Sequence, residues 1–426
     1  MTDLSDAFHP FPVPGLMHLG PRPAAVFSRG QGSWLFDLRG QRYLDLVQGW
    51  AVNTLGHAPP TLAQALTRQA DRLLQAGPGF YNDQAIELAQ RLTRLSGLDR
   101  AFICTSGAEA NEAAVKLARK WGSQHKRGHN GGQSGSQSGV QHGGANTVLS
   151  FEHSFHGRTL AMMAASGKPG FDRIYAPAVP GFVKLPFNNL AAVHAALTAD
   201  VSGKVVAVLV EPVQGEAGVI EADSGFLPGL RALCDAHRVL LIIDEVQTGI
   251  GRCGSLFAHT QFGVEPDILT LGKGLGGGVP IGAMLARESV CCFAPGDQGG
   301  TFHGNALVCA AALAVLDAVT APGFIDAVVA RGQQLAEGLS ALSVRHGLDG
   351  VRGRGLLQAL ALPAGLSSGL LADAARQPEA GDALLVNPAQ PRSLRLMPAL
   401  NIPAAEVALA LSLLDQTLQR VTAPAH

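Results

Sequence analysis

Two continuous apolar runs, each followed by a charged residue, constrain the fold of this chain more than any other feature. Residues 239–243 read Val-Leu-Leu-Ile-Ile and lead into Asp244. Residues 267–271 read Asp-Ile-Leu-Thr-Leu and lead into Gly272 and Lys273. Unbroken apolar runs of this length are typical of strands buried on both faces, as in a parallel sheet. Charged groups at the ends of such strands lie in the crevice where open α/β sheets bind ligands.

The combination of Asp244 and Lys273 indicates a specific chemistry. A lysine amine can form a Schiff base with an aldehyde, and a carboxylate can keep a pyridine nitrogen protonated. Together they are the minimal apparatus for pyridoxal phosphate chemistry. A lysine among glycines can also be an ordinary surface turn, but an aspartate at the end of the preceding strand makes that alternative less favourable.

Length, charge and cysteine content limit the classes of protein to consider. A chain of 426 residues is too long for one simple hydrophobic core, and its length indicates a large domain together with a smaller one. The 32 basic and 33 acidic side chains nearly balance, so the chain has no strong electrostatic field that would attract nucleic acid or a membrane surface. We therefore expect small-molecule ligands. The six cysteines form no CxxC pair and predict reduced thiols, and the N-terminus lacks the features of a secretory signal. A cytoplasmic protein is expected.

Strand and helix signals alternate along most of the chain. Residues 34–37 and 42–46 flank a glycine turn and predict a hairpin. Apolar spacing predicts helices at residues 60–74, 86–95, 109–121, 229–237 and 305–319. Short apolar runs predict further strands at residues 101–104, 147–151, 205–210 and 282–286. This alternation favours an α/β fold with a mostly parallel sheet.

The last third has a different character and indicates a smaller α+β domain. It predicts a helix at residues 325–345, a polar loop at 373–382, and strands at 356–362, 384–386 and 393–396. Another break in the pattern is the polar segment 122–146, which predicts a disordered surface insertion. Its histidines could in principle bind a metal, but a flexible linker is the better interpretation, and we predict no metal site.

Two loops after predicted strands carry candidate anion-binding groups. Ser106, Gly107 and Ala108 precede a helix, where backbone N–H groups could hold a phosphate. An ordinary turn with Ser106 as N-cap is the alternative. In the second loop, Phe155 could stack on a planar ring and Arg158 could bind a carboxylate. The histidines there, His153 and His156, could equally be loop residues satisfied by the backbone.

Three further motifs have competing interpretations. Glu211 and Glu216 follow a strand and could be the paired acids of a glycosidase or ion-paired loop residues. Gly249, Gly251 and Gly254 spell GxGxxG, but the spacing from the strand and the position of the next acid do not suit dinucleotide binding. A P-loop needs Ser or Thr after its lysine, and Gly274 follows Lys273, so that motif is excluded.

Six strings in a fixed order resemble one known family. They are SGAEANE, FHGRT, EPVQGEAGV, DEVQTGIGRCG, PDILTLGKGLGGGVPIGAM and RLMPAL. With them the chain resembles the class III aminotransferases, pyridoxal phosphate enzymes of fold type I. The resemblance implies a large cofactor-binding domain with a mostly parallel sheet and a small α+β domain. The implied ranges are residues 1–75 for an N-terminal segment packing with the small domain, 76–310 for the large domain and 311–426 for the small domain.

The resemblance also implies a reaction. We expect transfer of the δ-amino group of N-acetylornithine to 2-oxoglutarate, a step of arginine biosynthesis, in a homodimer with shared sites. Other ω-amines remain open: succinylornithine, N-succinyl-diaminopimelate, ornithine and 4-aminobutyrate. A same-fold aminomutase and a cofactor-free binding protein are less favoured alternatives.

The roles of individual residues follow from the same resemblance. Lys273 would hold the cofactor and move the proton, Asp244 would pair with the pyridine nitrogen, and Gln247 would bond the phenolic oxygen. Arg158 would bind the distal carboxylate of the substrate and Arg395 the α-carboxylate of glutamate, with Glu216 pairing with Arg395 when the ω-amine is bound. The implied cofactor-binding set is Ser106, Gly107, Ala108, Phe155, His156, Glu211, Asp244, Gln247, Lys273 and, toward the neighbouring subunit's cofactor, Thr301.

Overall fold

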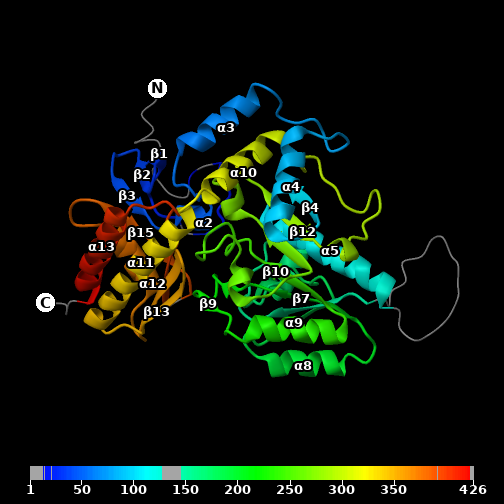
Figure 1. Cartoon of the computed structure of the whole chain (residues 1–426). Helices are drawn as coiled ribbons and strands as arrows, with labels where there is room; N and C mark the ends of the chain where they lie inside the picture. The colour runs from blue at the N-terminus through cyan, green and yellow to red at the C-terminus, as the bar shows by residue number, and fades with distance from the viewer. Residues whose placement is uncertain (1–12, 14, 21, 127–144, 391, 423–426) are drawn as a thin grey trace, which may run out of the picture.

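The computed structural model describes residues 13, 15–20, 22–126, 145–390 and 392–422 (Figure 1). Most of the predicted insertion, residues 127–144, lies outside the described residues, and so do two of its histidines. The remaining part of that segment differs from the prediction, because helix α5 (Gly107–His125) continues through its first four residues. In this last turn the Trp121 and His125 rings stack, with 4.9 Å between their centroids.

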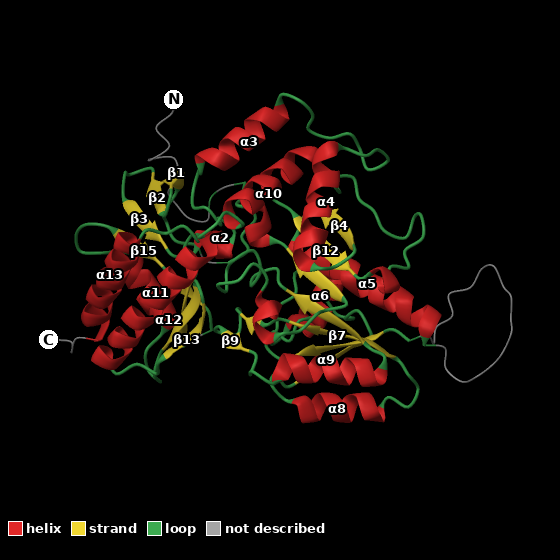
Figure 2. Cartoon of the chain, viewed as in Figure 1, coloured by secondary structure: helices red, strands yellow, loops and turns green. Residues whose placement is uncertain are grey.

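A seven-stranded sheet forms the centre of the molecule (Figure 2). Its order is β4-β12-β11-β10-β7-β5-β6. Only β12 runs against its two neighbours, so the predicted mostly parallel sheet is confirmed. The strands are β4 (Arg100–Cys104), β5 (Thr147–Phe151), β6 (Phe182–Leu185), β7 (Val205–Val210), β10 (Leu240–Asp244), β11 (Ile268–Leu271) and β12 (Gly282–Ala286).

Both faces of this sheet are buried, which explains the unbroken apolar runs. Helix α5 covers one face, where Ala113 and Leu117 join a core that includes Ile242. Helix α9 (Phe226–His237) packs on β10 and β7 at the other face, and Leu230 shares its core with Ile243. Adjacent strand residues point to opposite faces, so a strand between two helical layers needs apolar side chains at every position.

The carboxyl ends of the strands meet at one edge of the sheet. Glu211 follows β7, Asp244 ends β10, and Gly272 with Lys273 follows β11. Strand β4 runs in the same direction as β11, because both are antiparallel to β12, so Ser106 is carried to this edge as well. Residues from four separate parts of the sequence are therefore brought to one side of the sheet.

One of the smaller sheets joins an N-terminal and a C-terminal segment of the chain. In Figure 1 the N-terminal strands β1–β3, in blue, lie beside β15, in orange, and β3 pairs with β15 in parallel. The predicted hairpin is confirmed as β2 and β3. The sheets are β1 (Phe27–Gln31), β2 (Trp34–Asp37), β3 (Arg42–Asp45) and β15 (Ala383–Leu385); β13 (Val351–Arg354), β14 (Leu357–Ala361), β17 (Ser393–Leu396) and β16 (Asn387–Pro388); and β8 (Val213–Gln214) with β9 (Ile220–Glu221).

Every helix predicted from the sequence is present, further helices were not predicted, and one predicted loop is partly wrong. The predicted loop at residues 373–382 begins inside helix α12 (Ser368–Arg376), whose Leu371 and Ala375 are buried on one face. The other helices are α2 (Gln48–Ala51), α3 (Pro60–Ala70), α4 (Asp83–Ser96), α6 (Leu160–Ala165), α7 (Phe171–Ile174), α8 (Leu190–Ala199), α10 (Ala306–Val319), α11 (Phe324–His346) and α13 (Ala404–Thr422), with 3₁₀ helices η1 (Ala258–Phe262), η2 (Lys273–Gly276) and η3 (Glu288–Val290). The domain boundaries at residues 75 and 310 stay a prediction.

Within the described ranges, no helix taken singly has the length and apolar character to cross a membrane. One pair of helices, Ala306–Val319 with Phe324–His346, reaches that length and composition together across a 73° bend.

Candidate active site

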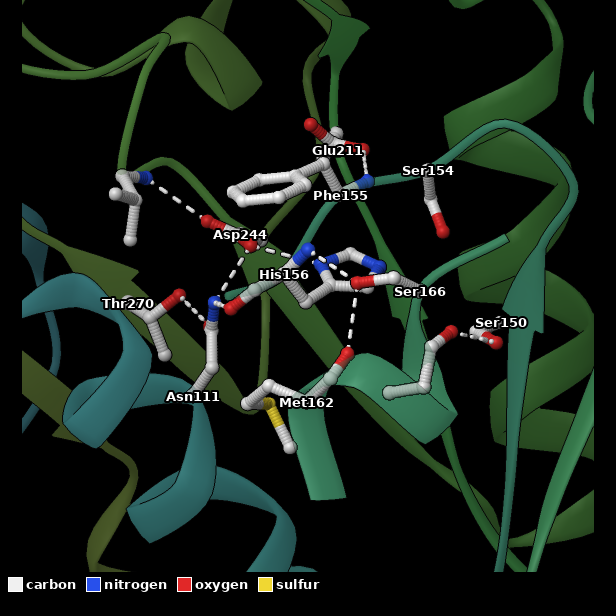
Figure 3. A network of polar contacts seen from close by, with 12 residues as sticks. Asn111, Ser150, Ser154, Phe155, His156, Met162, Ser166, Glu211, Asp244 and Thr270 are labelled. Atoms are coloured by element: carbon white, nitrogen blue, oxygen red, sulfur yellow. Dashed lines mark hydrogen bonds and ion pairs between the residues drawn. The ribbon is translucent and has the colours of Figure 1, made fainter. Parts of the chain in front are cut away.

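Asp244 lies buried at the end of β10 and accepts hydrogen bonds from three groups (Figure 3). Its Oδ2 accepts from Asn111 Nδ2 at 2.7 Å and from His156 Nδ1 at 2.8 Å, and its Oδ1 accepts from the Val246 backbone N–H at 2.9 Å. Because the carboxylate accepts here, His156 carries its proton on Nδ1. These contacts hold the carboxylate in one orientation.

Further polar groups stand behind Asp244. Asn111 also donates to the His156 carbonyl at 2.8 Å, and its Oδ1 accepts from Thr270 Oγ1 at 2.6 Å. Thr270 is the direct partner of Asp244 in the β10–β11 pairing. The roles of Asn111 and Thr270 are not predicted from the sequence; the available signals are a hydroxyl inside an apolar run and an asparagine early in a helix. His156 supports Asp244 from behind, and its Nε2 is buried without a partner among the described residues.

Lys273 lies in the turn after β11, where η2 begins. Its backbone φ of +39° is in the left-handed region, a strained conformation that often occurs at functional sites. Burial lowers the pKa of its amine and Arg395 lowers it further, while Asp244, Glu216 and Glu211 oppose this. Among the described residues no hydrogen bond or ion pair engages the amine. The amine is therefore available to a ligand.

Helix α5 begins at the predicted phosphate-binding motif. Ser106 is its N-cap, with Oγ accepting from the Glu109 N–H at 3.2 Å, as the alternative interpretation of the motif expected. The N–H groups of Gly107 and Ala108 lie in the first turn, where an α-helix offers no carbonyl acceptor of its own, and the helix dipole favours an anion there. A Cβ on Gly107 would overlap Val246 Cγ1, so the close approach requires glycine.

Glu211 and Phe155 are linked at the end of β7. The buried Glu211 carboxyl accepts from the Phe155 backbone N–H at 3.1 Å (Figure 3). Burial, followed by the charge of Asp244, raises the pKa of Glu211 well above its usual value. The Phe155 ring meets Phe171 edge to face, with 6.1 Å between their centroids. Glu211 thus fixes the backbone from which the Phe155 ring projects.

Arg158 lies exposed at the surface of the same loop. Its guanidinium is 5.9 Å from the Phe155 ring centroid and 5.6 Å from that of Phe171. In the part of the chain that the structure describes, no carboxylate pairs with it. An arginine resting on aromatic rings with an unused guanidinium can bind a carboxylate in bidentate fashion.

Arg395 is 1% exposed and is held by three side chains. Its Nε and Nη2 donate to Asn387 Oδ1 at 3.0 and 2.7 Å, and its Nη1 donates to Gln247 Oε1 at 3.2 Å. Its Nη2 also donates to Glu216 Oε1 at 2.7 Å. Asn387, directly opposite Arg395 in the β16–β17 pairing, is a site residue that the sequence does not predict, since nothing local distinguishes it.

The pKa of Glu216 reflects two opposing effects. Burial alone would raise it, but Arg395 and then Lys168 and Lys273 hold it below its usual value. The Glu216 carboxylate is therefore charged at neutral pH, and its ion pair neutralises the buried Arg395 guanidinium.

Thr301 is a predicted cofactor-binding residue for which the described residues show no contact with the other predicted site residues. It is exposed in the loop before α10, and its carbonyl accepts a hydrogen bond from Gln75 at 2.6 Å. The same loop is joined to the start of α4, because Asn82 donates to the Gly304 carbonyl at 2.8 Å.

The arrangement combines an amine, a buried acid, an anion-binding helix start and two arginines. A Cβ built on Gly272 would lie 3.0 Å from Gly107 Cα, so the turn that carries Lys273 touches the start of α5. Such a site can hold a phosphorylated, nitrogen-containing ring near the amine and can bind a substrate with two carboxylates.

Comparison with known families agrees with this chemistry. The family model described as aminotransferase class-III matches residues 19–418 of the chain. The chain is 53% identical over 414 residues to acetylornithine aminotransferase 2 of Bordetella bronchiseptica, which covers 97% of this chain and 99% of that protein.

Solved structures with the same architecture carry related names. The chain is similar to N-acetylornithine aminotransferase from Stenotrophomonas maltophilia, with a TM-score of 0.78 and 36% identity over 94% of this chain and 97% of that one. It is also similar to the ornithine aminotransferase of Toxoplasma gondii, with a TM-score of 0.86 and 30% identity over 95% of this chain and 92% of that one.

Proposed function

The chain belongs to the class III aminotransferases, and on that premise we propose that it transfers the δ-amino group of N-acetylornithine to 2-oxoglutarate. The products are N-acetylglutamate semialdehyde and glutamate, which makes the reaction a step of arginine biosynthesis. The observation that carries the proposal is the Glu216–Arg395 pair, at 2.7 Å, in a site whose charges also act on Lys273. The acetylornithine enzymes among its relatives support the choice of substrate.

The enzyme uses pyridoxal 5′-phosphate, and the described residues fit this cofactor. Lys273 would hold it through its unengaged amine, and the first-turn N–H groups of Gly107 and Ala108 would hold its phosphate. Phe155 would stack on its ring and Gln247 would bond its phenolic oxygen. When bound, the cofactor supplies an electron sink for the charge that develops on the substrate carbon.

Asp244 would hold the proton of the pyridine nitrogen. Its carboxylate is oriented by Asn111, His156 and the Val246 N–H, so no reorganisation is needed when the ring binds. A charged partner at this nitrogen keeps the ring protonated and able to accept electron density. His156 and Asn111 act through Asp244 and are positioning residues.

Lys273 would also move the proton during the reaction. The lowered pKa of its amine favours the neutral base that can take a proton from the substrate carbon. Its position at the tip of a strained turn keeps the nitrogen at the end of the strand, where the substrate carbon would lie.

Glu216 and Arg395 would adapt the site to two different substrates. N-acetylornithine brings its carboxylate to Arg158 and an uncharged flank to the opposite side, so Arg395 stays paired with Glu216. Glutamate brings a second carboxylate, which replaces Glu216 on Arg395. The ion pair therefore acts as a switch between two populated states, each favoured by one substrate.

We further propose a cytoplasmic homodimer in which Thr301 reaches the phosphate of the partner subunit's cofactor. The Gln75 and Asn82 hydrogen bonds join the loop of Thr301 to the segment 75–82, and both segments carry exposed aromatic side chains. Phe80, Tyr81 and Phe302 are 76%, 94% and 61% exposed. Large aromatic groups gathered in one region are typical of a protein interface.

Borohydride reduction tests the position of the cofactor. The reduced enzyme should carry the cofactor covalently on Lys273, as found by peptide mass spectrometry. Lys273→Ala should lose the visible absorbance and all measurable turnover, while Lys204→Ala, at an exposed lysine outside the site, should keep both. Attachment at a different lysine would refute the assignment.

A panel of ω-amines tests the substrate. Glutamate released from 2-oxoglutarate should be fastest with N-acetylornithine, measured as kcat/KM. Ornithine is the second candidate, because of the similarity to the Toxoplasma gondii enzyme. A higher kcat/KM for ornithine would transfer the proposal to that substrate, and turnover without 2-oxoglutarate would indicate an aminomutase.

A further inference from the structure

Glu216 lies between two cations. Its Oε1 accepts from Arg395 Nη2 at 2.7 Å, while Oε2 lies 3.6 Å from Lys168 Nζ. The Arg395 side chain is 1% exposed, whereas those of Glu216 and Lys168 are 26% and 34% exposed. The two oxygens of one carboxylate thus face a fully buried and a partly hydrated partner.

The backbone next to Lys168 is held by hydrogen bonds to the loop that carries Phe155 and Arg158. The neighbouring Gly167 donates its N–H to Ser154 Oγ at 3.0 Å, and its carbonyl accepts from the His153 N–H at 3.0 Å. The Lys168 amine lies 5.7 Å from the ring centroid of Phe155, the residue that follows Ser154. Within the described residues, Glu216 is the acid that pairs with it.

The Glu216 carboxylate needs a second partner when it leaves Arg395. When the α-carboxylate of glutamate occupies Arg395, the Glu216 side chain must leave, and a partly buried carboxylate without a partner is costly. The Glu216 carbonyl accepts from Gln390 Nε2 at 3.1 Å, which anchors the backbone, so the movement falls to the side chain. Lys168 already faces the oxygen that points away from Arg395.

We propose that Lys168 is the second partner of the Glu216 switch and holds its carboxylate while a substrate carboxylate occupies Arg395. This inference rests on the proposed function. It makes Lys168 a positioning residue for the dicarboxylate half of the reaction, with no role in binding the ω-amine. The Lys168 charge, third after burial and Arg395 among the influences on the pKa of Glu216, agrees with this arrangement.

Direct binding of the substrate by Lys168 is the competing explanation. Lys168 and Arg158 share the Phe155 and Phe171 rings, at 5.5 to 5.9 Å from the centroids, so Lys168 could help Arg158 to bind the distal carboxylate. Under that explanation, loss of Lys168 would weaken every ligand that uses Arg158. Under the switch proposal, it weakens only ligands that displace Glu216.

Two unreactive probes separate these explanations by calorimetry on the holoenzyme. Glutarate carries two carboxylates and must displace Glu216, whereas N-acetylnorvaline carries one carboxylate and an uncharged flank. Lys168→Met should raise the Kd of glutarate by about fivefold, the upper value for a partly exposed ion pair, and leave that of N-acetylnorvaline within about twofold. The half-reaction with glutamate should slow in parallel. Lys168→Arg should restore glutarate binding, and Lys204→Met is the matched control.

The same Lys168 substitution made in the Glu216→Gln variant completes the test. In Glu216→Gln the switch is absent, so adding Lys168→Met should have no further effect on glutarate binding. Equal weakening of both probes, a loss that persists in Glu216→Gln, or an unchanged glutarate Kd would each overturn the inference. If the parent enzyme binds glutarate and uses glutamate, such a result rejects only the role of Lys168. If the parent does neither, the proposed function fails with it.

Discussion

At the residue scale, the acid of the site depends on neighbours that do not touch the ligand. Asp244 is oriented by Asn111 and His156, and Asn111 is itself held by Thr270. A buried amide that satisfies three groups at once leaves all of them unpaired when it is lost. The chemistry of one carboxylate is thus set by residues from a helix, a loop and a neighbouring strand.

Asn111→Leu should lower kcat by about 10- to 100-fold, since a hydrogen bond to a charged group is worth about 1.5–3 kcal/mol. It should also shift the visible spectrum of the bound cofactor, because Asp244 would no longer be held in place. Steady-state kinetics and absorbance provide the two measurements. Thr270→Val removes only the outer hydroxyl and should cost less than about tenfold. Equal kinetics for parent and Asn111→Leu would contradict the positioning role.

Glu211 provides a prediction about pH. Its pKa is raised in the folded chain by burial and then by Asp244, so the stability it contributes is present below its unfolded pKa of about 4.3 and is lost as pH rises toward the folded value. Glutamine cannot ionise, so Glu211→Gln avoids this loss. Its free energy of unfolding relative to the parent should increase between about pH 5 and pH 8.

Chemical unfolding at several pH values measures this difference. Glu379→Gln, at an exposed acid, is measured alongside as the matched control for loss of a carboxylate. A flat profile for Glu211→Gln would mean that Glu211 ionises in the folded protein much as it does in the unfolded chain.

At the element scale, glycines allow close contacts that position the strand of Arg395. Gly332 in α11 packs against the turn between β13 and β14, where a Cβ would lie 2.5 Å from the Gly355 carbonyl oxygen. β14 pairs with β17, which carries Arg395. The helix therefore sets the position of the sheet on which the arginine lies.

Gly332→Ala should destabilise the fold by about 1–3 kcal/mol, because backbone atoms at this contact cannot rotate away. The control is Gly369→Ala in α12, where the nearest atom would be 3.5 Å away and alanine should be neutral or stabilising by up to about 1 kcal/mol. Thermal unfolding compares the two variants. A Gly332→Ala variant as stable as the parent would show that α11 can shift at little cost.

At the scale of the whole molecule, the exposed aromatic side chains give a prediction about assembly. Tyr81→Glu combined with Phe302→Glu should convert the dimer to monomers at micromolar concentration, measured by sedimentation velocity. Turnover should fall with the dimer fraction, because each site would lose the partner subunit's Thr301. Val344→Glu, which changes a side chain that is 86% exposed on α11, should leave the assembly intact. A dimer that survives the double substitution would place the interface on another surface.

Sequence patterns predict elements well where burial is uniform or strictly periodic. The strands β5, β7 and β12 match their predicted residues, because nearly all of their positions are buried and most of their side chains are apolar. Helix α13 was not predicted, although Val407, Ala410, Leu414 and Leu418 are buried at helical spacing. The last turns of α12 and α5 also differ from the prediction, because polar residues at helix ends carry little periodicity.

The sequence by itself determined which runs become buried strands and that Asp244 and Lys273 stand at their ends, since continuous apolarity and chain order are local properties. Only the tertiary structure decided the partners of those groups. Asn111 and Asp244 are 133 residues apart, and Glu216 and Arg395 are 179 apart. Such pairs depend on how helices and sheets pack, which no local pattern encodes, so the contacts that orient the acid and neutralise the arginine appear only in the folded chain.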